Sequence, residues 1–205
     1  MKKLLINAVV LPIFSQIHRM SPVTIVSLIF CVSEVSIFLL KRSKEQQTRT
    51  RSDKGSLRLF WIFIPVALFA AGYLRWPLRF AALPQDTCNT IALVLSIAGL
   101  LIRWLAIYQL GNLFTVDVAI AEDHALKTNG LYSIVRHPSY TGLLMVMTGI
   151  ALFMANWICL LLVVVPFCIL LGYRIHVEEA ALKAAFGEAY SAYQQRTKRL
   201  IPFIY

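Results

Sequence analysis

The residues whose types could do chemistry lie in two clusters, each beside a long apolar stretch. The first cluster starts with acidic residues between positions 117 and 123 and reaches Arg136-His137-Pro138. The second cluster runs from Arg174 to Glu179 and contains one histidine and two glutamates. Ionisable groups next to apolar stretches are costly to keep and are often functional. The two clusters together are therefore the candidate site.

Pro138 determines the expected geometry of the first cluster. A residue before proline is disfavoured in helical conformation, and proline suits the first turn of the helix that follows. Arg136 and His137 should then lie at a helix N-terminus, beside free backbone N–H groups that favour an anionic or strongly polar ligand. The same residues would equally suit a topological anchor, with arginine and histidine in the lipid headgroup layer. The residues alone leave both interpretations open.

Arg174 and Glu178 in the second cluster are four residues apart and share a helical face. An ordinary pair at this spacing contributes only a few tenths of a kcal/mol. These two residues follow an almost uncharged stretch, however, and partial desolvation strengthens the interactions of a charge. Two polar clusters on the same side of a membrane are stronger evidence for a functional site than a single ion pair is.

Composition predicts that membrane helices position these clusters. Of the 205 residues, 59% are hydrophobic and 15% are charged, whereas a soluble domain carries about 25% charged residues. The formal net charge is +10, but the basic residues collect at the edges of apolar segments, which is typical of topology and of contact with anionic lipids. We therefore predict membrane lipids as partners and no nucleic acid. The four cysteines form no CxxC pair, so neither a disulfide framework nor a metal site is expected.

The chain is predicted to be an all-α integral membrane protein with a bundle of about five transmembrane helices. A bilayer core needs roughly 20 mostly apolar residues per helix, and the stretches that approach this length are 22–40, 59–73, 91–108, 140–154 and 157–173. Asn156 should join the last two as a tight hairpin. Residues 4–17 are expected to form an interfacial helix, with a sixth span as the alternative. Three regions follow: an apolar or interfacial segment (1–21), the first three spans with a basic loop (22–109) and a catalytic region (110–205).

The distribution of Lys and Arg predicts the orientation. Residues 41–58 are dense in both and should be cytoplasmic. Alternation then places 111–139 and the C-terminal tail on the cytoplasmic side as well, so both polar clusters face one cytoplasmic pocket in a bacterial inner membrane. The apolar residues between 177 and 193 recur at the spacing of an amphipathic helix. Such a helix would lie on the bilayer surface or cap the pocket.

Several short motifs occur in order along the C-terminal half of the chain. They are Leu110-Gly111-Asn112, His124, Gly130-Leu131-Tyr132, Arg136-His137-Pro138-Ser139-Tyr140, Arg174, Glu178-Glu179, Leu182, Phe186-Gly187, Tyr190, Tyr193 and Arg199-Leu200-Ile201-Pro202. This order resembles the isoprenylcysteine carboxyl methyltransferase family and its prokaryotic relatives. The resemblance covers about the C-terminal half of the chain. It implies a helical membrane bundle with a cytoplasmic pocket for S-adenosyl-L-methionine.

The resemblance also implies roles for individual residues. Arg174 would orient the substrate, and a further cofactor contact would come from Asp117 or Ala119. Arg136 receives no contact and is interpreted as an anchor of the loop to the lipid headgroups. The residues implied to bind the cofactor are His124, Ala125, Leu126, Lys127, Tyr132, His137, Pro138, Ser139, Tyr140 and Glu178.

The predicted reaction is methylation of a lipophilic small molecule or a lipidated substrate, at a group that is most simply a carboxylate. A carboxylate is already ionised at neutral pH and needs orientation rather than a base, which the planar fork of Arg174 can supply. The alternatives are a phospholipid N-methyltransferase, which would need a base such as His137 or Glu179, and a non-enzymatic membrane protein or transporter. The start Lys2-Lys3 is typical of a bacterial chain, so the acceptor of eukaryotic relatives is not assumed.

Overall fold

The computed structural model describes residues 22–41, 50–51, 56–114, 119–120 and 126–205. Within these ranges the chain is almost entirely helical. The five long helices are α3 (Pro22–Lys41), α4 (Ser56–Leu74), α5 (Gln85–Leu110), α6 (Pro138–Leu152) and α7 (Trp157–Arg196). The predicted helix at 4–17 and most of the basic loop lie outside the described residues.

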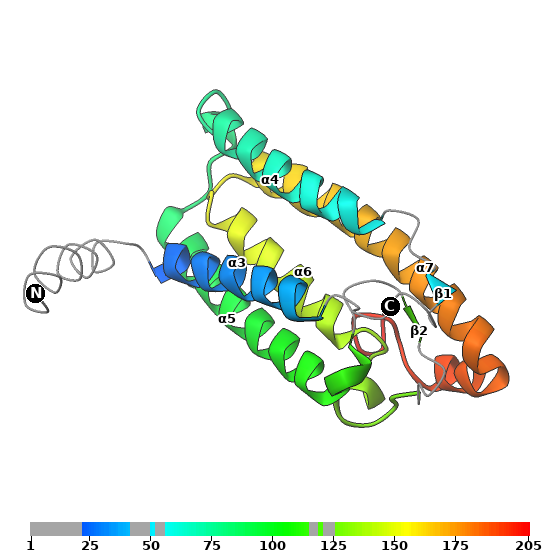
Figure 1. The fold of residues 1–205 in the computed structure, drawn as a ribbon. Coiled ribbons are helices and arrows are strands. Elements are labelled where there is room, and N and C mark those ends of the chain that lie inside the picture. The colour runs from blue at the N-terminus through cyan, green and yellow to red at the C-terminus, as the bar shows by residue number, and fades with distance from the viewer. Residues whose placement is uncertain (1–21, 42–49, 52–55, 115–118, 121–125) are drawn as a thin grey trace, which may run out of the picture.

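The helices form two groups that run side by side (Figure 1). Helices α3, α5 and α6 pack together, and α4 lies along α7. Three short 3-10 helices join them: η2 (Arg79–Ala81), η3 (Gly111–Leu113) and η4 (Gly130–Ser133). A two-residue strand, β1 (Thr50–Arg51), pairs antiparallel with β2 (Ala119–Ile120). This pair links the connection between α3 and α4 to the connection between α5 and α6.

Close backbone contact joins α5 to α6. A Cβ added to Gly99 would lie 2.6 Å from the carbonyl oxygen of Gly142, and one added to Gly142 would lie 2.5 Å from that of Gly99. Farther along, a Cβ on Gly149 would collide with Oγ of Ser96. Small residues at such contacts let helices approach closely where no hydrophobic force drives them together. This contact fixes the start of α6 against the C-terminal half of α5.

A tight hairpin joins α6 to α7, as the sequence predicts. Oδ1 of Asn156 accepts hydrogen bonds from the backbone N–H groups of Ile158 and Cys159, and so caps the N-terminus of α7. Nδ2 of Asn156 donates to the carbonyl oxygen of Leu78 at 2.7 Å. The asparagine therefore also ties the hairpin to the connection after α4.

Helix α7 is longer than the sequence analysis predicts. The apolar pattern predicts a span that ends at Tyr173 and a separate amphipathic helix at 177–193, whereas one helix continues through Arg174 and changes direction at Gly187. The prediction of a separate helix was wrong, because residues 174–186 contain no glycine or proline and are rich in strong helix formers, so the helix continues. Gly187 has φ +51° and ψ −122°, a backbone conformation that only glycine adopts readily. Residues Glu188 to Arg196 consequently fold back toward the start of α6.

The outer surface of the bundle is apolar. Among the described residues, α5 and α7 are long and apolar enough to cross a membrane, and α3, α4 and α6 contain shorter apolar segments. Large side chains point outward from several helices, with Phe69 of α4 79% exposed and Ile169 of α7 68% exposed. An exposed apolar surface of this extent is typical of contact with lipid.

Candidate functional site

The first turn of α6 is held in place by the chain that follows α7. The backbone N–H of Arg136 donates to the carbonyl oxygen of Lys198, and that of His137 donates to the carbonyl oxygen of Arg199. His137 occupies the N-cap position of α6 and Pro138 lies in its first turn, as predicted. Oγ1 of Thr141 donates to the carbonyl oxygen of Leu200. These bonds fix the first cluster against the segment that follows α7.

Glu179 lies at the centre of a buried ionic cluster. Its Oε1 accepts from Nε of Arg136 at 2.8 Å and from Nε2 of His137 at 3.3 Å. Its Oε2 accepts from Arg199, with Nε at 3.0 Å and Nη2 at 2.9 Å. Burial alone would raise the pKa of Glu179, but the hydrogen bonds from His137, Arg199 and Arg136 outweigh it and hold the pKa at about 2. Glu179 is therefore a structural anion and a very weak base.

Arg136 has a different role from the one the sequence analysis gives it. Its side chain is only 9% exposed, so the predicted anchor in the lipid headgroups was wrong. The guanidinium instead donates to Glu179 and to the carbonyl oxygens of Gln194 and Thr197 at the end of α7. Those carbonyls have no partner within the helix, and a cation satisfies them well.

Tyr140 connects Arg174 to Glu178. Nε of Arg174 donates to the Tyr140 hydroxyl at 2.8 Å, and this hydroxyl donates to Oε2 of Glu178 at 2.7 Å. The ring of His137 stacks on that of Tyr140 with centroids 5.6 Å apart, and its Nδ1 lies 3.8 Å from Oε1 of Glu178. Among the described residues, Oε1 of Glu178 accepts no hydrogen bond. It remains able to accept one from a ligand.

Tyr132 reaches the site through the 3-10 helix η4. Gly130, at φ +64°, starts this turn, and Oε1 of Gln109 accepts from the backbone N–H of Leu131. The Tyr132 hydroxyl donates to the carbonyl oxygen of Ala106, and the Tyr193 hydroxyl donates to the carbonyl oxygen of Tyr132 at 2.6 Å. Burial and the nearby charge of Glu178 raise the pKa of Tyr132 well above its usual range. The ring is thus clamped between α5 and the end of α7.

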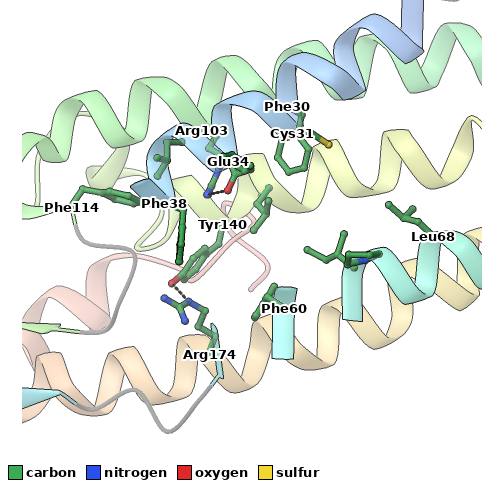
Figure 2. A pocket seen from close by; sticks show the side chains of 15 residues that line it. Phe30, Cys31, Glu34, Phe38, Phe60, Leu68, Arg103, Phe114, Tyr140 and Arg174 are labelled. Carbon is green, nitrogen blue, oxygen red and sulfur yellow. Dashed lines mark hydrogen bonds and ion pairs between the residues drawn. The ribbon is translucent and has the colours of Figure 1, made fainter. Parts of the chain in front are cut away.

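An apolar cavity of about 420 Å³ adjoins Arg174 and Tyr140 (Figure 2). Its walls come mainly from α3 and α4 and are largely aromatic and aliphatic. Figure 2 shows that the Arg174 guanidinium and the Tyr140 hydroxyl lie together at one end. The residues that line the cavity are Phe30, Cys31, Glu34, Val35, Ile37, Phe38, Phe60, Ile64, Pro65, Leu68, Arg103, Phe114, Tyr140, Leu143 and Arg174.

Glu34 and Arg103 form an ion pair in the wall of this cavity. Nε of Arg103 donates to Oε1 of Glu34 at 2.5 Å, and Nη2 donates to Oε2 at 2.6 Å. Nη1 of Arg103 also donates to Oγ of Ser139 at 2.9 Å. The motifs of the C-terminal half did not indicate this pair, because Glu34 and Arg103 both lie outside them. The available signal was charge: each is the only charged residue in its predicted span.

The residues expected to bind the cofactor are only partly brought together. Tyr132, His137, Tyr140 and Glu178 gather around the start of α6, next to Arg174. Two others are engaged elsewhere, since the Ser139 hydroxyl accepts from Arg103 and Pro138 is fully buried in protein.

The remaining expected residues precede η4. Leu126 and Lys127 are partly exposed in the irregular segment that leads to η4. Ala119 belongs to β2, whereas His124, Ala125 and Asp117 lie outside the described residues.

Several known proteins are similar to this chain. The model of the isoprenylcysteine carboxyl methyltransferase family matches residues 91–184. Protein-S-isoprenylcysteine O-methyltransferase B of Arabidopsis thaliana is 35% identical over 57% of this chain and 60% of its own length. The Schizosaccharomyces pombe enzyme is 33% identical over 64% of this chain and 56% of its own. For Arabidopsis enzyme A the identity is 31% over 64% of this chain and 68% of that protein.

A solved structure shares the fold. It is the eukaryotic intramembrane Ras methyltransferase, an isoprenylcysteine carboxyl methyltransferase, and it is similar with a TM-score of 0.56 and 29% identity over 74% of this chain and 53% of that chain. The described part of the chain thus has the helical fold of that intramembrane protein. The chain belongs to the isoprenylcysteine carboxyl methyltransferase family. It spans about 40 to 60% of the length of the first relatives it matches.

Proposed function

We propose that this protein is an integral membrane methyltransferase that uses S-adenosyl-L-methionine to methylate a carboxylate on a lipophilic acceptor. The observation that carries the proposal is the position of Arg174. Its guanidinium lies at the polar end of an apolar cavity and is joined through Tyr140 to Glu178. An acceptor with an apolar chain and a terminal carboxylate has the shape and charge for this cavity. The relatives, which are named for isoprenylcysteine methylation, support the same class of acceptor.

The donor set at the start of α6 fits S-adenosyl-L-methionine. That cofactor carries an amino group and an adenine amine, which are hydrogen-bond donors, and Oε1 of Glu178 accepts no hydrogen bond from a described residue. Tyr132, His137 and Tyr140 would border the cofactor. When bound, the cofactor supplies an electrophilic methyl group on sulfonium sulfur.

The chain's own contribution is positioning. Arg174 would hold the acceptor carboxylate by charge-assisted hydrogen bonds, with its plane fixed by the bond to Tyr140. Glu178, which is bound to the same hydroxyl, would hold the cofactor at a fixed position relative to that carboxylate. The apolar walls would exclude water. Orientation and water exclusion are what an in-line displacement at carbon requires, because an ionised carboxylate needs no base.

An amine acceptor fits these side chains poorly. It would need a base, and Glu179, one of the two candidates, has a pKa of about 2 and is therefore a very weak base. A cationic amine would also meet the Arg174 guanidinium. Both points weigh against a phospholipid N-methyltransferase.

The proposed placement is a bilayer crossed by α3, α4, α5, α6 and α7, with the site facing the cytoplasm of a bacterial inner membrane. The charge distribution predicts that the basic residues 41–58 and the C-terminal tail face the same, cytoplasmic side. The acceptor would enter the cavity from the bilayer and the cofactor from the aqueous side.

The first test is calorimetric titration of the detergent-solubilised protein with S-adenosylhomocysteine. Absence of measurable binding would contradict the proposal and would favour a non-enzymatic membrane protein. The second test incubates the protein and membrane lipid extract with methyl-labelled cofactor, then treats the product with mild base. A methyl ester releases labelled methanol, whereas an N-methyl product keeps its label. Retention of the label would overturn the carboxylate assignment, and Arg174→Ala provides the background control.

A further inference from the structure

We propose that the hydroxyl of Tyr190 is an additional cofactor contact, which hydrogen-bonds the nucleoside part of bound S-adenosyl-L-methionine. This inference rests on the proposed function. The motif Tyr190 was recognised in the sequence, but neither the resemblance nor the site described above gives it a role.

Tyr190 is the largest fully buried side chain in the described part of the protein. Its exposure is 1%, yet its hydroxyl has no hydrogen-bond partner there. Buried hydroxyls in native structures almost always have a partner, so an orphaned one calls for a missing group. The neighbouring tyrosine shows the contrast. Tyr193 is also buried, but its hydroxyl donates to Tyr132.

Tyr190 lies next to the proposed cofactor region. Its ring lies 6.0 Å from that of Tyr193, whose hydroxyl holds Tyr132. Gly187 turns the last part of α7 back, and on that part both tyrosines are buried, with Tyr190 close enough to Glu179, Glu178 and Arg136 to be affected by their charges. Tyr190 thus reaches the site from a segment that carries no other predicted cofactor residue.

The charges around Tyr190 indicate which part of the cofactor it contacts. Burial raises the pKa of Tyr190, and the charges of Glu179 and Glu178 raise it further while Arg136 opposes them, so the hydroxyl stays protonated as a donor. Two nearby carboxylates disfavour a third negative group. A neutral acceptor is favoured over the amino-acid carboxylate, and the adenine ring nitrogens and ribose oxygens are the neutral acceptors of the cofactor.

The test compares Tyr190→Phe with Tyr193→Phe. Thermal unfolding without ligand should give Tyr190→Phe a midpoint at or above that of the wild type, because no protein hydrogen bond is lost. Tyr193→Phe should lower the midpoint, since it removes the bond to Tyr132. Calorimetry should then show that Tyr190→Phe binds S-adenosylhomocysteine roughly tenfold more weakly, the usual effect of one good hydrogen bond.

A second ligand separates the two ends of the cofactor. 5′-Methylthioadenosine lacks the amino-acid part, and Tyr190→Phe should weaken its binding by the same factor. A penalty seen with S-adenosylhomocysteine alone would overturn the nucleoside assignment.

Other outcomes are equally decisive. Unchanged dissociation constants in Tyr190→Phe, with normal wild-type binding, would mean that water satisfies the hydroxyl; the inference would fail and the proposed function would stand. Loss of thermal stability equal to that of Tyr193→Phe would reveal a protein partner and also overturn it. No binding by the wild type would overturn both.

Discussion

Arg174 and Glu178 lie one turn apart on α7 and bind the same atom, the hydroxyl oxygen of Tyr140 on α6. The hydroxyl accepts from the arginine and donates to the carboxylate. The residue proposed to hold the acceptor and the residue proposed to hold the cofactor are therefore oriented by one shared group. Rotation of either side chain would break its bond to the hydroxyl group that also orients the other.

Tyr140→Phe is expected to uncouple the two residues. The phenyl ring can keep its stacking on His137, while Arg174 and Glu178 each lose a charge-assisted hydrogen bond worth about 1.5–3 kcal/mol. We expect kcat to fall by at least about tenfold, with a smaller effect on the dissociation constant of S-adenosylhomocysteine. Steady-state kinetics and calorimetry measure the two quantities. An unchanged kcat would contradict the positioning role.

Arg174→Ala is expected to abolish methyl transfer while cofactor binding largely survives. The variant removes the only group assigned to the acceptor carboxylate. The control is Lys183→Ala, which removes an exposed cation from the same helix. If Arg174→Ala instead prevented calorimetric binding of S-adenosylhomocysteine, the division of roles between Arg174 and Glu178 would be wrong.

Removing one partner of the ion pair between Glu34 and Arg103 should destabilise the protein more than removing both partners. Glu34→Ala leaves a buried guanidinium uncompensated, at a cost of about 3–5 kcal/mol. The double variant Glu34→Met with Arg103→Met leaves no unpaired charge, and it should recover most of the lost stability. Thermal unfolding in detergent gives the comparison. Equal losses in the two variants would contradict the ion-pair account.

Glu179 should make the protein sensitive to acid. Its folded-state pKa of about 2 lies below the ordinary 4.5, so its stabilising contribution is present above about pH 4.5 and is lost as the pH falls toward 2. Glu179→Gln should be less stable at neutral pH and should show a flatter decline on acidification. Glu188→Gln, at an exposed position of the same helix, is the control. Identical pH profiles for wild type and Glu179→Gln would rule out this linkage.

Gly187→Ala should loosen the end of α7. A Cβ at this position meets no atom within 4 Å, but φ +51° is unfavourable for alanine, so the cost is purely conformational and about 1 kcal/mol or more. Gly172→Ala is the matched control, because Gly172 lies within regular α7 and also has open space; it should be neutral or stabilising. The unfolding midpoints of the two variants show whether the backbone conformation at position 187 requires glycine, while position 172 does not. A lower unfolding midpoint in both variants would contradict this explanation.

Hydrophobic runs predicted the helices well because each run is long and ends at a clear signal. Pro138 and Asn156 marked the start of α6 and of α7 correctly. The sequence did not reveal that α7 continues past Arg174, because a change from apolar to polar residues ends a span without ending a helix. It also misassigned Arg136, whose partners Gln194 and Thr197 are about 60 residues away and bind through backbone oxygens. Such contacts depend on the turn at Gly187, and they produce no recognisable pattern in the sequence around Arg136.

Helix α6 is short, and its length bears on the depth at which the proposed reaction takes place. Its 15 residues extend about 22 Å at 1.5 Å per residue, whereas the hydrocarbon core of a bilayer is about 30 Å thick. If Asn156 marks one interface, the turn that carries His137 and Tyr140 ends several ångströms short of the other. An acceptor's carboxylate would then be drawn beneath the plane of the headgroups to meet Arg174, while its chain remained among the lipid tails.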